Sequence, residues 1–275
     1  MKVFLDVDPQ LAASCQSAGR SVDGLEWVSE AREGDAVIID KIRSLPADKP
    51  ILFLGALSEL VDSNRNFDEL EGRLRVGPRR RFEPSHQSLF ESQRAGQLGE
   101  LGLLRLHRWF GRADSDFSRK EDLLVHLDVA LWLYGEMPET IYAVSGGSDS
   151  IMQIHMGFPK RGMAILDFAW ELPAGRDYDS LHLIGDRGAA YSDDHRNVSL
   201  LYSGSDPQAL KVENEEAGFA TLLSQFVNSE SKSKPSLASL TEVLAVKKVA
   251  EAVMRSSASG QPSGRIGNEF VEGEN

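Results

Sequence analysis

Cysteine is scarce in this sequence, and long apolar runs and a net positive charge are absent; each of these features excludes a class of protein. Cys15 is the only cysteine in 275 residues, which excludes a disulfide framework and fits a reducing cytoplasm. No apolar run approaches the roughly 18 residues of a membrane-spanning helix, and Asp6 and Asp8 interrupt the place where a signal peptide has its apolar centre. The net charge of -12 argues against nucleic-acid or anionic-membrane partners. We therefore expect a globular cytoplasmic protein.

The first 78 residues alternate short apolar runs with helical or turn segments. The runs are VFLDVDP (3–9), GDAVIID (34–40), KPILFLG (49–55) and RLRVG (73–77). Such alternation is typical of an α/β domain, so we expect a parallel sheet here.

From about residue 98 the pattern changes to longer strands separated by turn residues. They predict a large, mostly antiparallel sheet of α+β type, with strands expected at 99–111, 139–146, 150–158, 162–172, 178–186, 188–193 and 198–204. Helices are expected at 84–96, 121–135, 215–230 and 237–260. We thus expect domains at 1–78 and 79–262, with the closing helix 238–258 able to pack back on the first. The polar, Gly-rich residues 263–275 predict a flexible tail.

Three segments together resemble the glucose-fructose oxidoreductase / inositol dehydrogenase / MocA (Gfo/Idh/MocA) family. RLRVGPRRRFEPSHQSLFESQRAGQLGE is similar to a family strand, Arg-Phe-x-Pro motif and helix. DLLVHLDVALWLYG resembles the active-site helix, and LTEVLAVKKVAEAVMRSSASGQP the closing helix. The resemblance covers about residues 2–262 and implies a Rossmann domain followed by a domain built on a large, mostly antiparallel sheet. It also implies an NAD(P)-dependent dehydrogenase acting on a sugar, polyol or related carbonyl compound.

The start of the chain departs from that family. VFLDVDPQLAASCQ is similar to the second strand and helix, in which Asp6 would hold the ribose hydroxyls of NAD. The first strand and the G-x-G-x-x-G turn that binds the pyrophosphate would then precede Met1, so we expect a truncated Rossmann-like domain, or a miscalled start codon. Asp6 could equally cap the next helix.

The strand end at Leu54-Gly55-Ala56 lacks the family's reactive group. Aligned to the family motif Glu-Lys-Pro, it places Gly55 where a lysine polarises the substrate oxygen. Losing one such preorganised contact commonly costs about 10²–10³ in rate. The connection KIRSLPAD (41–48) is also too short for a helix-containing crossover.

The best remaining signal for catalysis is the Asp-x-x-x-His spacing of Asp122 and His126. This spacing puts both side chains on one helix face, and the resemblance implies that they lie beside the substrate, where His exchanges the proton that accompanies hydride transfer. Asp128, however, follows His126 by two residues instead of the family's three. If Asp128 sets the register, His126 is turned by about 100° from the family position. The alternative is that His126 is a packed helix residue and Asp122 a first-turn acid favoured by the helix dipole.

Three other patterns have structural explanations that we favour over functional ones. Arg79, Arg80 and Arg81 could contact an anion, but they suit a solvated loop together with the structural Arg-Phe-x-Pro pattern. SDDH (192–195) has metal-ligand residue types in a row on an expected surface turn, so no metal site is expected. SGGSDS (145–150) reads as a hairpin turn because no helix follows it.

Two functional hypotheses follow. The first is an oxidoreductase-like scaffold impaired in NAD(P) binding and catalysis and kept as a binding or assembly module, paired with itself through the C-terminal sheet or with an intact paralogue. The second is an active NAD(P)-dependent dehydrogenase of a sugar-like small molecule, with Asp6, Asp122 and His126 in its site.

Overall fold

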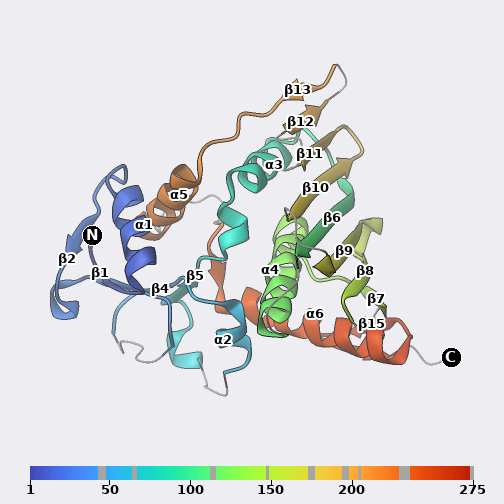
Figure 1. The fold of residues 1–275 in the computed structure, drawn as a ribbon, viewed down its shortest axis with the longest axis horizontal. Coiled ribbons are helices and arrows are strands. Elements are labelled where there is room, and N and C mark those ends of the chain that lie inside the picture. Colours follow the sequence, from blue (N-terminus) through green and yellow to red (C-terminus); the bar gives the residue numbers. More distant parts are fainter. Residues whose placement is uncertain are drawn as a thin grey trace. The chain divides into compact units, whose positions relative to one another are not determined.

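The computed structural model divides the chain into two compact units (Figure 1). The first unit comprises Met1–Pro84 and Glu213–Leu244, and the second comprises Ser85–Val212 and Ala245–Asn275. The structure describes residues 1–42, 48–63, 67–111, 116–146, 149–172, 177–193, 198–203, 206–228 and 236–272. Most of the connection 41–48, for which we expected no crossover helix, lies outside the described residues.

The first unit is built on a six-stranded sheet that is parallel apart from one edge strand. Its order is β14-β5-β4-β3-β1-β2, formed by β1 (Lys2–Asp6), β2 (Glu26–Val28), β3 (Ala36–Ile39), β4 (Ile51–Phe53), β5 (Leu74–Val76) and β14 (Ala238–Ser239). Only β14 runs antiparallel to its neighbour. The α/β alternation in the sequence correctly predicted this parallel sheet.

Strands β1 and β3 are direct neighbours at the position where a dinucleotide-binding fold has one more strand between them. In the standard order 3-2-1-4-5-6, the first strand separates the second from the fourth. Here β1, which resembles the family's second strand, pairs directly with β3 from Val3↔Ala36 to Asp6↔Ile39. These strands are hydrogen-bonded neighbours, so the position of the intervening strand is closed.

Two helices pack together on this sheet: α1 (Pro9–Gly19) and α5 (Glu215–Val227). Leu222, Leu223 and Phe226 of α5 join Val3 and Ile38 of the sheet in one apolar cluster. The predicted boundary differs from this arrangement, because residues 213–244 were assigned to the second domain and belong to the first unit. The apolar face of α5 is buried by strands that lie far away in the sequence.

The second unit is built on a ten-stranded sheet whose order is β13-β12-β11-β10-β6-β9-β8-β7-β15-β16. Every pairing is antiparallel except that of β6 with β9, as expected for a large, mostly antiparallel sheet. Its long strands are β6 (Leu101–Gly111), β7 (Thr140–Gly146), β8 (Ile151–Gly157), β9 (Met163–Leu172), β10 (Tyr178–Gly185), β11 (Ala189–Asp193) and β12 (Val198–Tyr202). At one edge lies the short strand β13 (Gln208–Ala209).

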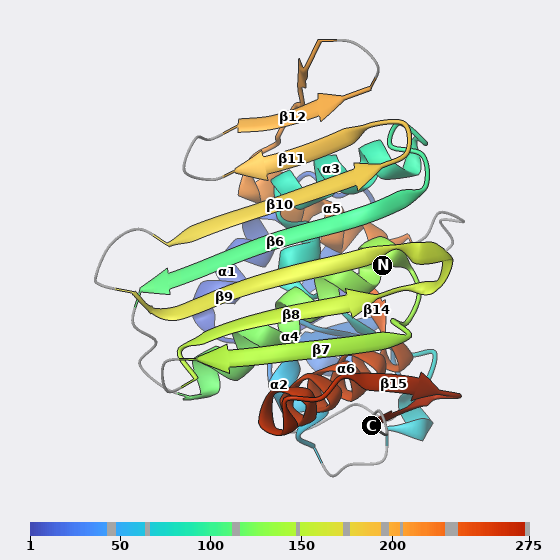
Figure 2. The same cartoon turned by 90° about the vertical axis from the view of Figure 1, so that its right-hand side faces the viewer.

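Helices cover one face of this sheet and leave the other open (Figure 2). The covering helices are α3 (Pro84–Arg94), α4 (Asp116–Tyr134) and α6 (Leu240–Ser259), of which α6 contributes its first turn, to Leu244, to the first unit. Phe90 of α3 stacks on Trp132 of α4, with ring centroids 4.1 Å apart. Ser256 of α6 accepts a hydrogen bond from the Ala143 amide of β7 at 3.0 Å.

The flexible tail predicted for residues 263–275 is wrong for its described part. Residues Ser263–Ile266 (β15) and Glu269–Glu272 (β16) form a hairpin that extends the sheet from β7. Arg265 anchors it, since its amide donates to the Glu139 carbonyl at 2.7 Å and its Nε to the Pro138 carbonyl at 2.9 Å. Phe270 is buried, so the hairpin adds an apolar contact as well as strand hydrogen bonds.

A capping box begins α6 and ties it to a buried arginine. The Glu242 carboxylate accepts from the amide and hydroxyl of Ser239, and the Glu242 amide donates back to the Ser239 hydroxyl. Its other oxygen lies 3.1 Å from a nitrogen of Arg81, whose side chain is 1% exposed. Burial raises the pKa of Glu242, but Arg81 and Ser239 outweigh it and hold that pKa below its ordinary value. Arg81 is therefore a structural cation, as expected from the Arg-Phe-x-Pro pattern, whereas the expected solvated loop is wrong for this residue because its side chain is buried.

Replacing Glu242 with alanine is expected to lower the free energy of unfolding by about 2–3 kcal/mol, because it removes a cap and leaves the Arg81 guanidinium buried without that carboxylate. Since the folded pKa is depressed, the contribution is present above the ordinary value near 4.5 and is lost as the pH falls through the folded pKa. Urea unfolding at pH 7 and at pH 3.5 measures both effects. Glu251→Ala, an exposed change on the same helix, is the control; equal losses in the two variants would contradict the proposed role.

Candidate functional site

The carboxyl edge of the first sheet has a topological switch point between β1 and β3. From β1 the chain passes through α1 to β2 on one side, and then returns to β3 on the other. In open α/β sheets, ligands bind outside the carboxyl ends of the strands at such a point. This edge is therefore where a dinucleotide would be held.

At this edge the protein's own carboxylate occupies the N-terminus of α1. Asp8 Oδ1 accepts hydrogen bonds from the amides of Gln10 at 2.9 Å and Leu11 at 3.0 Å, and Pro9 at the first position has no N–H. A pyrophosphate binds to free amides at a helix N-terminus. Asp8 has taken those amides, so α1 offers no equivalent anion site.

Negative charge gathers around the same position. Asp6 ends β1 and is exposed, Asp40 follows β3, and the Asp8 amide donates to Asp40 Oδ2 at 3.1 Å. The alternative that Asp6 caps the next helix is wrong, because Asp8 is the cap. Three carboxylates at one strand edge repel a polyphosphate by Coulomb's law.

The only cysteine lies on α1 and is not a nucleophile. Burial, with a smaller contribution from the charge of Asp8, raises the pKa of the Cys15 thiol to about 11. A thiol with that pKa is protonated at neutral pH, and the thiolate is the reactive form. Cys15 is therefore a core residue.

Gly55, which the sequence resemblance places at the position of the family lysine, has no room for any side chain. A Cβ placed on Gly55 would lie 2.1 Å from the Asp40 carbonyl oxygen and 2.5 Å from the Phe53 ring. The first contact is with backbone, which cannot rotate away. The absence of a side chain at this position is therefore built into the packing of β3 against the segment that follows β4.

Gly55→Lys is expected to lower the free energy of unfolding by at least about 2 kcal/mol, because the added Cβ forces the backbone of β3 or of residues 54–56 to move. Ala56→Lys, which adds the same charge one residue later at a half-buried position, is the matched control and is expected to cost less. Thermal or urea unfolding of both variants measures the difference. A Gly55→Lys protein as stable as the parent would show that the segment yields freely.

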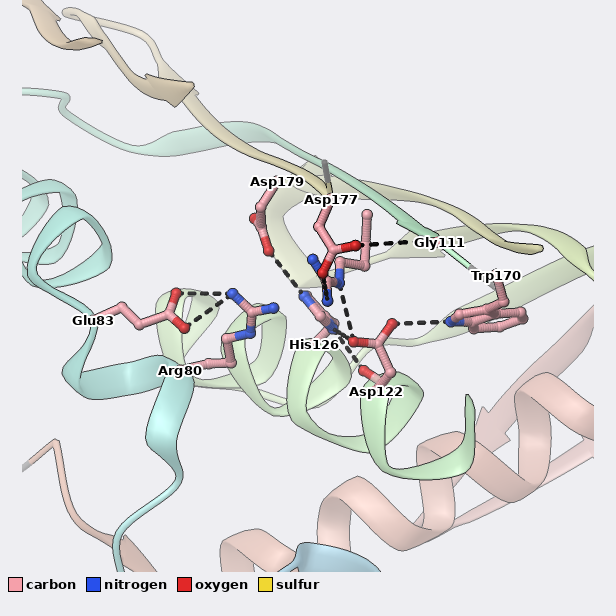
Figure 3. A network of polar contacts seen from close by, with 9 residues as sticks. Arg80, Glu83, Gly111, Asp122, His126, Trp170, Asp177 and Asp179 are labelled. Atoms are coloured by element: carbon pink, nitrogen blue, oxygen red, sulfur yellow. Dashed lines mark hydrogen bonds and ion pairs between the residues drawn. The ribbon is translucent and has the colours of Figure 1, made fainter. Parts of the chain in front are cut away.

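In the second unit, Asp122 of α4 lies at the centre of a polar network beneath the sheet (Figure 3). Asp122 Oδ1 accepts from Arg108 Nε at 3.1 Å, and Oδ2 accepts from Trp170 Nε1 at 2.9 Å. Arg108 also lies 3.4 Å from Asp177 Oδ2, and Asp177 Oδ1 accepts from the Gly111 amide at 3.2 Å. Both oxygens of Asp122 are thus already engaged by donors from β6 and β9.

His126 is brought next to Asp122, as the helical spacing predicts, but its side chain is 0% exposed. Nδ1 lies 2.6 Å from the Asp122 carbonyl oxygen, which can only accept, so Nδ1 donates to it. Nε2 faces Asp179 Oδ2 at 3.4 Å, and the ring packs edge-on against Phe168 with centroids 5.6 Å apart. Each ring nitrogen therefore has a partner within the protein (Figure 3).

Asp128, which raised the question of register, is also fully buried. Helix α4 is covered on most of its circumference, since Leu123, Leu124 and Leu127 are buried with it. Burial alone therefore does not show which of His126 and Asp128 faces the sheet. The contacts of His126 show that it does, because its ring touches Phe168 of β9 and Asp179 of β10.

The other patterns found in the sequence do not assemble a site among the described residues. Arg80 forms a two-pronged pair with Glu83, with both distances 2.9 Å. Asp193 ends β11, whereas Asp194 and His195 lie outside the described residues. Within the described part, no group of three or more His, Cys, Asp and Glu side chains could hold a metal ion. No helix there is long and apolar enough to cross a membrane.

The uncovered face of the ten-stranded sheet, here called the open face, presents four rows of side chains. Strand register places them side by side from β12 to β7. One row is polar and contains Asp193, Ser180, His107, Asp167 and Gln153; the next contains Tyr191, His182, Arg105, Ile165, His155 and Tyr142. Large apolar side chains are exposed on this face at Trp109, Tyr142, Val144, Ile151, Met163, Ile184 and Tyr202.

Comparison with solved structures finds the same fold in several oxidoreductases. A myo-inositol dehydrogenase from Corynebacterium glutamicum is similar at 12% identity and a TM-score of 0.72, over 97% of this chain and 99% of that one. An oxidoreductase from Agrobacterium radiobacter in complex with NAD⁺, L-tartaric acid and magnesium is similar at 14% identity and a TM-score of 0.69, over 96% of this chain and 98% of that one. An aldose-aldose oxidoreductase from Caulobacter crescentus complexed with glycerol is similar at 14% identity and a TM-score of 0.69, over 96% of this chain and 99% of that one.

The chain therefore has the fold of the Gfo/Idh/MocA oxidoreductases, which the sequence resemblance implied. No protein-family model matches the sequence, and no curated protein is significantly similar to it. The structural likeness at these identities establishes the fold.

Sequence reasoning missed Asp8, Arg108, Trp170, Asp177 and Asp179. A usable signal existed for two of them. Asp8 precedes Pro9, and Asp before a first-turn proline is a helix start signature. Arg108 falls in register with Leu104 and Leu106 on the inward side of β6, where a charged residue requires a buried partner.

His126→Ala is expected to lower the free energy of unfolding by about 2–4 kcal/mol, because it empties a fully buried site and removes the ring contacts with Asp122 and Asp179. His155→Ala, at an exposed position on β8, is the control and is expected to change stability by less than about 0.5 kcal/mol. Urea unfolding measures both. An equally small effect at His126 would argue for a functional instead of a structural role.

Proposed function

We propose that this chain is a Gfo/Idh/MocA oxidoreductase scaffold that is impaired in NAD(P) binding and turnover and serves as a binding or assembly module in the cytoplasm. The single observation that carries the proposal is Asp8, whose carboxylate occupies the amides of α1, so that the helix N-terminus at the switch point offers no site for a phosphate. An isolated phosphate contact elsewhere does not replace those amides, because the helix N-terminus combines free donors with a favourable dipole.

Two further features support impaired cofactor chemistry independently. The direct pairing of β1 with β3 leaves no strand between them from which a Gly-rich turn could lead into a pyrophosphate-binding helix. Gly55 excludes the family lysine by backbone contact with Asp40. The scaffold therefore departs from the dehydrogenase pattern at the phosphate site, at the strand order and at the catalytic lysine.

The open face supports the assembly part of the proposal. Seven strands spaced by about 4.8 Å and four rows of side chains cover roughly 34 by 27 Å, or on the order of 900 Å². A standard protein interface buries about 800 Å² on each partner. Exposed aromatic and aliphatic side chains spread over such an area are typical of an interaction surface. The proposed partner is a second copy of this chain, or an intact paralogue with the same face.

A second candidate function rests on the Asp122–His126 pair. Nδ1 of His126 lies 3.6 Å from Asp122 Oδ1, and Asp179 approaches the other ring nitrogen. In an active NAD(P)-dependent dehydrogenase of a sugar or polyol, this pair would exchange the substrate proton, and Asp6 would hold the ribose. The neighbours crystallised with NAD⁺ and L-tartaric acid or with glycerol are consistent with such ligands. The burial of His126 favours the scaffold, since a buried imidazole requires motion to reach a substrate.

Calorimetric titration with NAD⁺, NADH, NADP⁺ and NADPH up to millimolar concentration tests the cofactor part. We expect no binding tighter than millimolar, because the amides of α1 are engaged and three carboxylates face the phosphates. A Gfo/Idh/MocA dehydrogenase titrated in parallel is the positive control. Micromolar affinity for any of the four would overturn the proposal and favour the dehydrogenase, with His126→Ala assayed first on polyols.

A further inference from the structure

The polar row of the open face is a continuous hydrogen-bonded chain across four strands. Gln153 Nε2 of β8 donates to Asp167 Oδ1 of β9 at 2.6 Å, and Asp167 Oδ2 lies 3.3 Å from His107 Nε2 of β6. His107 Nδ1 lies 3.0 Å from Ser180 Oγ of β10. Because a carboxylate only accepts, a neutral His107 donates to Asp167 and accepts from Ser180. Ser180 is fully buried, so this Ser–His–Asp arrangement joins strands and offers no accessible nucleophile.

A second imidazole packs against this row. The rings of His107 and His182 are edge-on with centroids 6.2 Å apart, and His182 lies in register between Arg105 of β6 and Tyr191 of β11. The Tyr191 ring is 5.5 Å from His182. A proton on His182 would therefore be placed beside the fixed charge of Arg105 and the imidazole of His107.

We propose that His182, packed against His107 at the centre of the open face, makes the association of two copies through this face depend on pH, so that the copies separate as the medium becomes acidic. The inference rests on the assembly function proposed above and adds its regulation. A second copy is the partner that the face fits best, because the face carries both Arg105 and Asp167 and a two-fold axis can set unlike charges opposite each other.

The sign follows from solvation and charge. Burial, then His107 and Arg105, lower the pKa of His182 from its ordinary value of 6.5, and Asp193 opposes them only in part. A second copy would remove further water from the ring and so disfavour the charged form more. The assembled pKa is then lower than the free pKa. The affinity between the two copies is therefore highest at pH values above the pKa of His182 in the free chain, and it falls as the pH drops below that pKa.

The other charged groups facing the pair do not supply the same response. They are Arg105 on β6, Asp167 on β9 and Asp193 on β11, with His155 further along on β8. Histidine is the side chain whose ordinary pKa places its charge change between pH 5 and 8. A change of affinity between pH 5 and 8 therefore points to a histidine of the open face. Variants of His182 and His155 test whether His182 is the one responsible.

Sedimentation equilibrium of the full chain at pH 7.5, 6.5 and 5.5 tests the inference. A two-fold dimer holds two copies of His182, so the dissociation constant rises by up to about 100-fold for each pH unit below the free pKa, and we expect at least a tenfold reversible rise between pH 7.5 and 5.5. His182→Gln is expected to remove that rise. His155→Gln, exposed on the same face, is expected to keep it.

The outcomes separate the two proposals. Association with one dissociation constant at all three pH values would overturn the pH switch and leave the assembly function intact, whereas a monomer throughout would overturn both. A full pH response in His182→Gln would show that another group is the sensor. If that variant does not fold, NMR titration of His182 in the unmodified chain, below and above the dissociation constant, replaces it; an equal pKa in both states would overturn the inference.

Discussion

The direct pairing of β1 with β3 is the constraint on which the first unit depends. Four consecutive register pairs hold these strands together and bring Asp6 and the segment after β3 to one edge. Because β3 sits beside β1, the Asp8 amide reaches Asp40, and the Asp40 carbonyl lies against Gly55. The occupied helix terminus and the missing side chain at position 55 thus belong to one packing arrangement. A change in one of them would strain the others.

The second unit holds charged side chains beneath its sheet. Arg108, on the inward side of β6, is paired with Asp122 and Asp177, and Trp170 satisfies the remaining oxygen of Asp122. A buried charge is tolerated only when partners and hydrogen bonds replace its water. His126 is fitted into this network by its contacts with Asp122 and Asp179. The residues that resemble a catalytic pair are therefore also those that hold α4 to the sheet.

Much of the fold could be predicted from the sequence, because strand and helix periodicity is local. The parallel and antiparallel sheets and the adjacency of Asp122 and His126 all follow from spacing along the chain. The assignment of α5 to the first unit could not be predicted, since an amphipathic helix does not specify which sheet covers its apolar face. Nor did the hairpin of residues 263–272, whose short polar strands are held by backbone groups of Pro138 and Glu139. The partners of Asp122 were missed for the same reason, because two separate strands, β6 and β9, bring them together.

Gly55 also affects how this sequence can change over evolutionary time. A point mutation to lysine at this position meets the Asp40 carbonyl before its ammonium reaches any substrate. Accepting a lysine here would require the backbone after β3 to shift first, and that segment is held by the pairing of β3 with β1 and by the Asp8–Asp40 hydrogen bond. Stepwise substitution at this position therefore passes through less stable intermediates. The packing around Gly55 therefore restricts which residues this position can accept, independently of any chemistry at the site.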